Sequence, residues 1–368
     1  MSNAYANRIG RAVEVMGQQG VDALLVGPGA DMFYFTGFDH SHAGERLLAF
    51  VLRRDGSSAW ISPTMNVAQI RPHAGADQPI RAWTDTESYL PALREALQGS
   101  TAIAFDDEAR AAFLMDLLDT VPAAKISRAS SILRGIRIRK QADELARMRA
   151  AARTVDETIA EAISFCRPGS SEAEIDERLR AALLARSPEN AVAFTIIASG
   201  ENASHPHHET GARKLQQGDV VILDYGTRYE GYHSDITVTC SVGEPSDPEV
   251  RKVYRTVWEA QQKALEAIRP GVPCQAIDRA AREHITAAGY GEYFIHRTGH
   301  GLGLQVHEPP YMVEGNEELL EEGMTFSIEP GIYLPGRFGV RLEVIASVGP
   351  HGVDPINAPS APELPITG

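Results

Sequence analysis

Two acidic residues, Asp224 and Asp235, stand eleven positions apart in a segment whose pattern predicts a β-hairpin. Gly231 between them suits a tight turn, and a hairpin centred between positions 229 and 230 would place the two acids opposite each other. Opposite residues share a face of the hairpin, with Cβ atoms roughly 4.5–5.5 Å apart. Carboxylates at that distance repel each other unless they share a proton or a cation. Taken alone, the pair could also be two solvent-facing loop acids.

A second pair, Glu329 and Glu343, repeats this arrangement around Gly336. A loop centred on that glycine again places two acids opposite each other. The residues on both sides of these acids alternate between apolar and polar types, which is typical of half-buried strands. Because an unpaired charge is costly in such a strand, surface carboxylates become a poor explanation for both pairs.

Between the two pairs lies a segment rich in glycine and histidine, residues 296–310, which contains His296, His300 and His307. Glycine lets the backbone approach a ligand closely, and imidazole binds metals or transfers protons. For each histidine, a structural hydrogen-bonding role is the alternative. The glycine spacing does not fit a dinucleotide-binding turn, and no H-E-x-x-H zinc motif is present.

The combined set of side chains predicts a metal centre. Four carboxylates and one imidazole, without a thiolate, suit two divalent ions such as Mn²⁺, Co²⁺ or Zn²⁺. The four negative charges would balance the charge of two such ions. Two bridged ions roughly 3.5–4 Å apart can activate water and polarise a carbonyl group, so we expect hydrolytic chemistry.

The composition is that of a folded soluble protein. The chain has 368 residues, of which 43% are hydrophobic and 23% charged, and this length favours two domains. No segment approaches the roughly 20 apolar residues of a membrane helix, and no secretory signal is visible, so we expect a cytoplasmic protein without membrane contact.

Charge and cysteine content narrow the class further. The formal net charge of −14 makes nucleic-acid binding a poor interpretation and is compatible with a site for cations. The three cysteines, Cys166, Cys240 and Cys274, are far apart in the sequence and have no C-x-x-C spacing. We therefore predict buried thiols in a reducing compartment.

The elements that must position the site change character near residue 135. Residues 1–135 alternate helical patterns with short strands and predict an α/β domain, with strands at 22–26, 47–52, 59–61 and 101–105 and a helix over 91–98. Residues 136–368 predict an α+β domain with an antiparallel sheet. Its expected helices are 141–165, 171–186, 248–268 and 274–288, and its expected strands are 193–199, 219–227, 232–240, 324–333 and 340–348.

Five motifs in this order resemble those of the pita-bread metallopeptidases. They are Leu-Asp-Tyr-Gly at Asp224, Ser-Asp-Ile-Thr at Asp235, Gly-His-Gly-Leu-Gly at His300, Ile-Glu-Pro-Gly at Glu329 and Arg-Leu-Glu at Glu343. The resemblance covers nearly the whole chain and is closest to the proline-specific branch, the Xaa-Pro dipeptidases (prolidases) and aminopeptidase P. It implies a creatinase-like domain over 1–135 followed by a pita-bread catalytic domain over 136–368.

The resemblance also implies roles for single residues. The acids Asp224, Asp235, Glu329 and Glu343, together with His300, would bind two metal ions, with Mn²⁺ expected and Co²⁺ or Zn²⁺ as alternatives. Glu329 would also act as the general base.

Two further histidines match positions that act on the substrate in the family. His207 lies in Ser-His-Pro-His-His, and His307 matches the histidine that contacts the scissile peptide. The neighbouring His205 and His208 are expected to be surface residues without a role. Val238 and Val344 depart from the family pattern, which usually has arginine at the first position and an acid or asparagine at the second.

Substrate length depends on how the free carboxylate of a dipeptide is recognised, and guanidinium is its natural partner. The expected substrate-binding residues are Arg297 and its neighbour His296, Arg341, and Arg46. Arg46 ends a charged loop, residues 37–46, that resembles the loop which short bacterial prolidases insert into the partner subunit's active site. The alternative is an ordinary solvated loop. The resemblance therefore favours a homodimer.

The sequence thus predicts hydrolysis of the Xaa-Pro bond in dipeptides by two divalent ions. Aminopeptidase P activity on longer peptides is the first alternative. A non-catalytic binding protein of the same fold is a second alternative, which the complete ligand set argues against. Metal-free, creatinase-type chemistry is disfavoured for the same reason.

Overall fold

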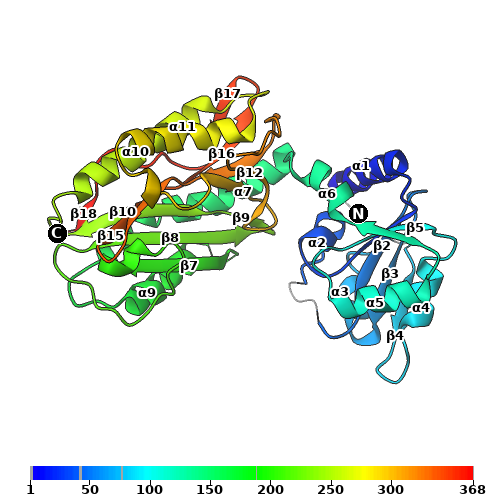
Figure 1. Cartoon of the computed structure of the whole chain (residues 1–368). Coiled ribbons are helices and arrows are strands. Elements are labelled where there is room, and N and C mark those ends of the chain that lie inside the picture. Colours follow the sequence, from blue (N-terminus) through cyan, green and yellow to red (C-terminus); the bar gives the residue numbers. More distant parts are fainter. Residues whose placement is uncertain (1–2, 41–43, 76–77, 188, 368) are drawn as a thin grey trace. The chain divides into compact units, whose positions relative to one another are not determined.

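The computed structural model describes residues 3–40, 44–75, 78–187 and 189–367. It divides into two compact units, Met1–Arg137 and Ile138–Gly368 (Figure 1). Among the described residues, no helix has the length and apolar character required to cross a membrane.

The first unit is an α/β layer built on a six-stranded sheet, which confirms the predicted fold class. The strand order is β4-β3-β2-β1-β5-β6, with β1 antiparallel to β2 and parallel to β5. The strands are β1 (Ala23–Val26), β2 (Ala49–Arg53), β3 (Ser58–Pro63), β4 (Ile80–Trp83), β5 (Ala102–Phe105) and β6 (Lys125–Arg128). The helices are α1 (Asn3–Gln19), α2 (Ala30–Thr36), α3 (Val67–Ile70), α4 (Leu90–Ala96), α5 (Ala111–Thr120) and α6 (Ser130–Arg137).

The outer strands β4 and β6 were not predicted from the sequence. Trp83 is the one buried side chain of β4, and β6 buries none fully. By contrast, all four residues of β1 are buried, as expected for a central strand covered on both faces. An edge strand that buries so little has no apolar run by which it could be recognised.

The second unit is an α+β layer, as predicted. One antiparallel sheet contains β7 (Ala191–Ser199), β8 (Val220–Tyr229), β9 (Tyr232–His233) and β10 (Ile236–Val242), with β18 (Ile366–Thr367) parallel to β10 at its edge. A second sheet has the order β12 (Glu308–Met312), β11 (Gly299–Gly301), β13 (Thr325–Ile328), β16 (Val344–Gly349) and β17 (Gly352–Pro355). The hairpin of β14 (Gly331–Leu334) and β15 (Phe338–Arg341) completes the unit.

The helices of this unit are α7 (Ala142–Asp156), α8 (Ile159–Phe165), α9 (Glu172–Arg186), α10 (Val250–Ala267) and α11 (Cys274–Ala287). The prediction of one helix over 141–165 is wrong, because the helix is interrupted between α7 and α8. At the break the hydroxyl of Thr158 donates to the carbonyl oxygen of Thr154 at 2.6 Å. Threonine that bonds back to the preceding turn commonly bends a helix.

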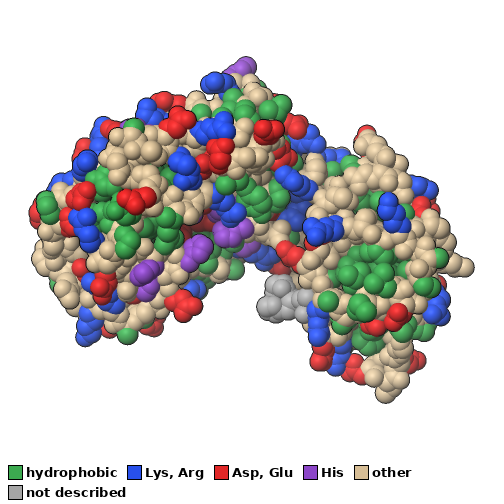
Figure 2. Space-filling view, in the orientation of Figure 1, with side chains coloured by type: hydrophobic (Ala, Val, Ile, Leu, Met, Phe, Trp, Pro, Cys, Tyr) green, Lys and Arg blue, Asp and Glu red, His purple; other side chains and the backbone are tan. Residues whose placement is uncertain are grey.

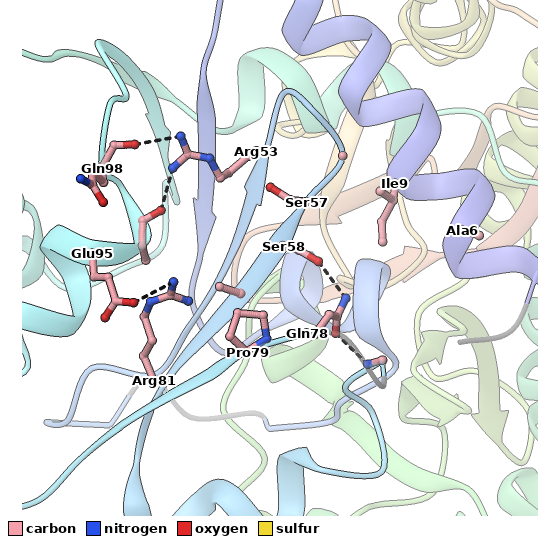
Figure 3. Close-up of a pocket in the computed structure, with 14 residues that line it drawn as sticks. Ala6, Ile9, Arg53, Ser57, Ser58, Gln78, Pro79, Arg81, Glu95 and Gln98 are labelled. Carbon is pink, nitrogen blue, oxygen red and sulfur yellow. Dashed lines mark hydrogen bonds and ion pairs between the residues drawn. The ribbon is translucent and has the colours of Figure 1, made fainter.

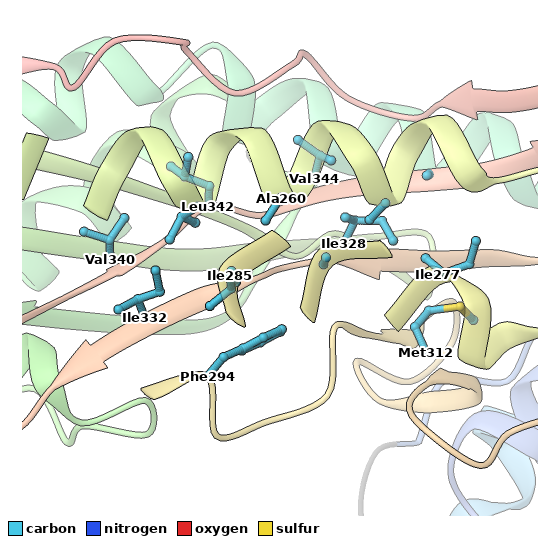
Figure 4. Close-up of a cluster of buried hydrophobic side chains, with 14 of the residues drawn as sticks. Ala260, Ile277, Ile285, Phe294, Met312, Ile328, Ile332, Val340, Leu342 and Val344 are labelled. Carbon is cyan, nitrogen blue, oxygen red and sulfur yellow. The ribbon is translucent and has the colours of Figure 1, made fainter. Parts of the chain in front are cut away.

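The core of the second unit lies between α10 and α11 and the strands that carry the second acidic pair. Figure 4 shows Ala260 of α10 and Ile277 and Ile285 of α11 with strand residues such as Ile328 and Val344, and all are buried. The three cysteines are buried and free, as predicted. This packing fixes the backbone immediately behind the acidic residues.

Candidate metal centre and active site

The hairpin register predicted around Gly336 is confirmed. Ile328 pairs with Val344 in the β13–β16 ladder, and the β14–β15 ladder continues in the same register. Glu329 and Glu343 are the opposite residues at an interruption between these two ladders, rather than within a strand as expected.

The backbone at this interruption bonds to other parts of the unit. The amide of Glu329 donates to Thr298 O at 2.8 Å, and the amide of Glu343 donates to Thr237 O at 3.0 Å. The second bond joins this hairpin to β10, directly beside the first acidic pair. The interruption therefore links both acidic pairs through the backbone.

A buried glutamine of α10 holds the interruption from behind. Gln261 Nε2 donates to Ile328 O at 3.1 Å and to Leu342 O at 2.9 Å. These are the carbonyl groups that immediately precede the two acids. The side chain of Gln261 is fully buried, so water cannot replace these bonds.

The predicted register of the first hairpin is wrong, because the turn is centred one residue later in the chain than predicted. Asp224 pairs with Thr237, and the turn residues are Glu230 and Gly231, with φ values of 44° and 90°. Two-residue turns with two positive φ angles match the twist of a hairpin, and glycine favours the second position. Asp235 therefore lies two positions before the residue opposite Asp224. The two acids are diagonal neighbours on one face instead of a direct pair.

The structure brings the five predicted ligands together. Three overlapping groups have ligand atoms within 4.8 Å of one another, and they are Asp224, Asp235 and Glu343, then His300, Glu329 and Glu343, then Asp235, His300 and His307. The third group also places His307 within reach of a cation. Its ring meets that of His300 edge-on, with centroids 4.1 Å apart.

The imidazole of His300 is oriented as a metal ligand would be. Its Nδ1 lies 3.1 Å from Gly301 O, which makes Nδ1 the protonated nitrogen, because a carbonyl oxygen can only accept. Its Nε2 then faces Asp235 Oδ2 at 3.6 Å and Glu329 Oε1 at 3.3 Å. Burial, together with the neighbouring His307, lowers the pKa of His300 to about 3, so the ring is neutral at pH 7.

The acids cannot all be ionised without compensating charge. Burial, and then the charges of Asp224 and Glu329, raise the pKa of Asp235 well above its usual value. Burial, and then the charge of Asp235, raise the pKa of Glu343 in the same way. Burial also raises the pKa of Glu329 to about 7. Such a group binds either protons or cations.

Two oxygens of this group fit a cation better than a hydrogen-bond donor. Thr237 Oγ1 donates to Glu343 Oε2 at 2.7 Å, and Arg341 Nη2 donates to Asp224 Oδ2 at 2.7 Å. The other oxygen of each carboxylate, Glu343 Oε1 and Asp224 Oδ1, is buried without a donor among the described residues. Buried polar atoms are almost always partnered, so oxygen and imidazole ligands left open here suit divalent ions.

A cavity of about 750 Å³ opens beside the acidic group. Its lining combines all five predicted ligands with His207, His296, Arg297, His307 and Arg341, and its apolar lining is Phe194, Ile196, Pro206 and Val306. His207 and His307 are both exposed on the cavity side of the unit. Figure 2 shows histidine side chains clustered on one face of this unit.

Arg341, predicted to bind substrate, is engaged within the protein. Its Nη2 bonds to Asp224, its Nε donates to Thr237 Oγ1 at 3.2 Å, and its Nη1 donates to Tyr333 Oη at 2.9 Å and to Pro206 O at 3.3 Å. A fully engaged guanidinium holds Asp224 in place and has little freedom to meet a substrate carboxylate.

His296 and Arg297 occupy the same wall of the cavity but differ in their engagement. His296 Nδ1 contacts Arg297 O at 2.7 Å, and its Nε2 lies 2.9 Å from Tyr333 Oη. Burial and the charge of Arg341 lower the pKa of His296 to about 4, so it is neutral. The guanidinium of Arg297 lies 4.5 Å from the ring centre of Tyr311, and within the described part of the chain it has no carboxylate partner.

Arg46 belongs to the first unit, where its guanidinium binds Asp85 Oδ1 at 2.7 Å and Glu45 Oε1 at 2.9 Å. Residues 41–43 of the predicted loop lie outside the described residues. The proposed role of Arg46 at a partner's site therefore stays a prediction.

The sequence reading missed two residues that shape the site. His208 was expected to have no role, but its Nε2 lies 2.8 Å from Glu172 Oε2, and its side chain is 15% exposed. Tyr333 connects Arg341 to His296. Strand alternation could have revealed Tyr333, because it stands two positions after Gly331, the residue paired with Arg341. His205 is exposed, as predicted.

The first unit has a cavity of similar volume, about 820 Å³, with a different lining. Arg81 faces Glu95 in this cavity (Figure 3), and the charged groups lie 3.2 Å apart. Arg53 donates to the carbonyl oxygens of Ala96 and Gln98 at the end of α4. The lining of this cavity has one acid, Glu95, which is paired with Arg81, and it has no histidine. The chemistry-bearing residues gather in the second unit.

Comparison with known proteins agrees with this geometry. Residues 146–349 match metallopeptidase family M24, and residues 8–139 match the creatinase/prolidase N-terminal domain. A probable dipeptidase, PepE, of Mycobacterium tuberculosis is 38% identical over 360 residues, covering 97% of this chain and 95% of that protein.

Two crystal structures show the same architecture. A recombinant prolidase from Thermococcus sibiricus has a TM-score of 0.93 and 35% identity, covering 100% of both chains. An X-Pro aminopeptidase from Thermotoga maritima has a TM-score of 0.86 and 29% identity, covering 97% of this chain and 99% of that one. The chain therefore belongs to metallopeptidase family M24, with a creatinase/prolidase N-terminal domain before a pita-bread catalytic domain.

Proposed function

We propose that the protein is a dipeptidase that hydrolyses the bond between an N-terminal residue and proline with two divalent ions. The observation that carries the proposal is the group of four carboxylates and His300, beside a cavity lined by three further histidines. Two cations held there would activate water and polarise the scissile carbonyl. Similarity to a protein described as a probable dipeptidase and to a prolidase supports the substrate class.

Glu329 is proposed as the general base as well as a ligand. Its side chain is 14% exposed, compared with 6% for Asp235 and 10% for Asp224. It is the acid among these three with the best access to water in the cavity. A carboxylate within hydrogen-bond reach of the attacking water can accept its proton and later pass it to the leaving amine.

His207 and His307 are proposed to act on the substrate. Both line the cavity, and burial together with the charge of Arg297 lowers the pKa of His307, so it is neutral at pH 7. A neutral imidazole still offers one N–H donor. Such a donor stabilises the carbonyl oxygen as negative charge develops on it.

Arg297 is proposed to bind the free carboxylate of the dipeptide. His296 is proposed to stabilise the cavity wall beside Arg297. Unlike the guanidinium of Arg341, that of Arg297 packs against an aromatic ring and forms no ion pair with an acid of the described chain. Arg297 also lines the cavity. Guanidinium can bind a carboxylate through two parallel hydrogen bonds. Arg46 is proposed to add a second cation from the neighbouring subunit of a homodimer.

The remaining parts of the proposal concern the metal and its setting. Mn²⁺ is the proposed ion, with Co²⁺ or Zn²⁺ as alternatives, because the ligands are mainly carboxylate oxygens. The proposed location is the cytoplasm, which suits three free cysteines.

The test is to incubate Mn²⁺-loaded protein with Ala-Pro and with Ala-Pro-Ala and to separate the products. We expect rapid hydrolysis of Ala-Pro, and a KM for Ala-Pro that rises at least tenfold in Arg297→Met, since a largely desolvated charge pair is lost. Arg279→Met, which removes an exposed arginine paired with Glu314, is the matched control and should leave the KM unchanged.

The same experiment decides between the candidate functions. Faster cleavage of Ala-Pro-Ala than of Ala-Pro would favour the aminopeptidase, which similarity to the X-Pro aminopeptidase structure supports as second candidate. If protein with bound metal hydrolysed neither peptide, the result would contradict the proposal. Arg46→Ala tests the proposed role of the 37–46 loop, since an unchanged ratio of dipeptide to tripeptide cleavage would exclude that loop from substrate recognition.

A further inference from the structure

The segment that carries His207 follows the short turn η2 (Gly200–Ser204) and is anchored on both sides of that histidine. On one side, Pro206 O accepts a hydrogen bond from Arg341 Nη1 at 3.3 Å. On the other side, His208 Nε2 lies 2.8 Å from Glu172 Oε2. One anchor leads to the metal centre, through Arg341, and the other leads to the first residue of α9.

Glu172 is a fully buried carboxylate whose oxygens are saturated with donors. Its Oε1 accepts from Ser199 N at 2.8 Å, Ser199 Oγ at 2.7 Å and Asn202 Nδ2 at 3.0 Å, and its Oε2 accepts from Gly211 N at 3.2 Å. Burial alone raises the pKa of Glu172, but the bonds from Asn202, His208 and Ser199 outweigh it and lower the pKa below its usual value. Since a carboxylate can only accept, His208 Nε2 is the donor.

The residues that bond to Glu172 are themselves held in place. Arg213 Nη1 donates to Ser199 Oγ at 2.9 Å and to Asp219 Oδ2 at 2.6 Å. The chain passes this guanidinium at Gly200, where φ is 54° and an added Cβ would lie 2.2 Å from Arg213 Nη2. Glu172 is therefore part of a packed polar network and not a mobile surface acid.

We propose that His208, through its hydrogen bond to Glu172, is a positioning residue that holds His207 at the cavity for catalysis. The inference rests on the proposed function and deepens it. His208 itself is not part of the cavity lining, whereas Pro206 and His207 are. It acts on the reaction by restricting the segment and does not contact the substrate.

The size of the effect follows from the population of the active conformation. With the His208 anchor removed, the segment is held by Arg341 and by its ends, and other conformations become accessible. If one tenth of the molecules keep His207 in place, the rate falls about tenfold. Because His207 is proposed to stabilise the transition state, the loss falls on kcat and not on KM.

A matched pair of amide substitutions tests the anchor in the metal-loaded, full-length protein. The side-chain nitrogen of glutamine can reach the position of histidine Nε2, whereas the asparagine side chain is too short to place its nitrogen there. We expect His208→Asn to lower kcat for Ala-Pro about tenfold, with unchanged KM and metal content, and His208→Gln to keep most of the activity. His205→Ala, in the same segment, should behave as wild type.

Hydrogen exchange gives a second readout that does not depend on activity. Backbone amides of residues 207–211 should exchange faster in His208→Asn than in His208→Gln or wild type. Equal behaviour of the two variants, in kcat and in exchange, would overturn the proposal. If wild type fails to cleave Ala-Pro, the proposed function is wrong, while the exchange comparison still decides whether His208 anchors the segment.

Discussion

The two acidic pairs are presented by hairpins of different construction. In the first hairpin, β8 runs unbroken through Asp224, whereas Asp235 lies in the gap between β9 and β10, on the same face and two positions from a direct pairing. In the second hairpin, the ladder stops at Glu329 and Glu343, which remain directly opposite. The first pair is thus diagonal, with one acid in a continuous strand and one in a gap, whereas both acids of the second pair lie at an interruption and are directly opposite.

The difference shows what an interruption allows. At Glu329 and Glu343 the backbone amides are released from their own ladder and bond to Thr298 and Thr237 instead. Those bonds bring the histidine segment and the first hairpin to the same point. Gln261 stabilises the interruption by binding the two carbonyl groups before the acids. The direct pair is therefore the junction of the site, and the diagonal pair is supported by it.

Removal of an acid of the second pair should have the largest effect. Glu343 belongs to two of the three ligand groups, so Glu343→Ala should lose at least one metal ion per chain and more than about 100-fold in turnover. Elemental analysis and Ala-Pro hydrolysis measure both effects. Unchanged metal content with normal turnover would show that the junction does not hold metal.

His307 lies outside both hairpins, so its removal should separate catalysis from metal binding. His307→Ala should keep both ions and lose roughly 100-fold in kcat, the scale of one lost proton-transfer or oxyanion partner. Metal content measured beside kcat separates these effects. A loss of metal in proportion to activity would place His307 among the ligands, as its position near Asp235 and His300 permits.

Gln261 tests the second hairpin alone. Gln261→Leu leaves two buried carbonyl groups without donors and should destabilise the protein by about 1–3 kcal/mol. Metal affinity should fall roughly 10-fold, because the ligands lose their support. Denaturant unfolding and metal titration measure both. A variant with normal metal affinity would mean that packing of Ile328 and Leu342 suffices to hold the interruption.

The crowded acids predict how stability depends on pH. The pKa values of Asp235 and Glu343 are raised, and that of Glu329 is about 7, because of burial. When groups bind protons more tightly in the folded than in the unfolded chain, the folded protein loses stability as the pH rises. The lowered pKa values of His296, His300 and His307 oppose this trend below about pH 6.5. The Tm of metal-free protein should therefore fall between about pH 6.5 and 8, and Mn²⁺ should raise it most at pH 8. A metal-free Tm that rises over this range would contradict the shared-charge account.

The turn of the first hairpin should matter least. Glu230 has a φ of 44° and an exposed ion pair with Arg147. In Glu230→Asn, relief at the positive φ offsets a surface pair of small value, so the free energy of unfolding should change by less than about 0.5 kcal/mol. Activity and metal content should equal wild type. Loss of metal would show that this turn sets the position of Asp235.

The sequence was most informative where a pattern was regular. The register around Gly336 followed from residue numbers alone, because both ladders keep it across the interruption. The register of the first hairpin did not, because Glu230 takes a positive φ that its residue type disfavours. The edge strands β4 and β6 bury too little to form a recognisable pattern.

Contacts between distant segments were out of reach. Nothing in the Ser-His-Pro-His-His motif distinguishes His208, which meets a buried acid 36 positions earlier in the chain, from His205, which is exposed. In the same way, Arg341 resembled a free cation until its contacts with Asp224 and Tyr333 were visible. Such roles depend on tertiary packing and not on local pattern.

The most direct test of the account is to titrate metal-free protein with Mn²⁺ while recording bound metal and Ala-Pro hydrolysis together. We expect activity to reach its maximum at two ions per chain, with Glu343→Ala failing to reach that stoichiometry. Full activity without bound metal, or saturation of wild type without any hydrolysis of Ala-Pro, would contradict a site in which four acids and His300 hold two catalytic ions.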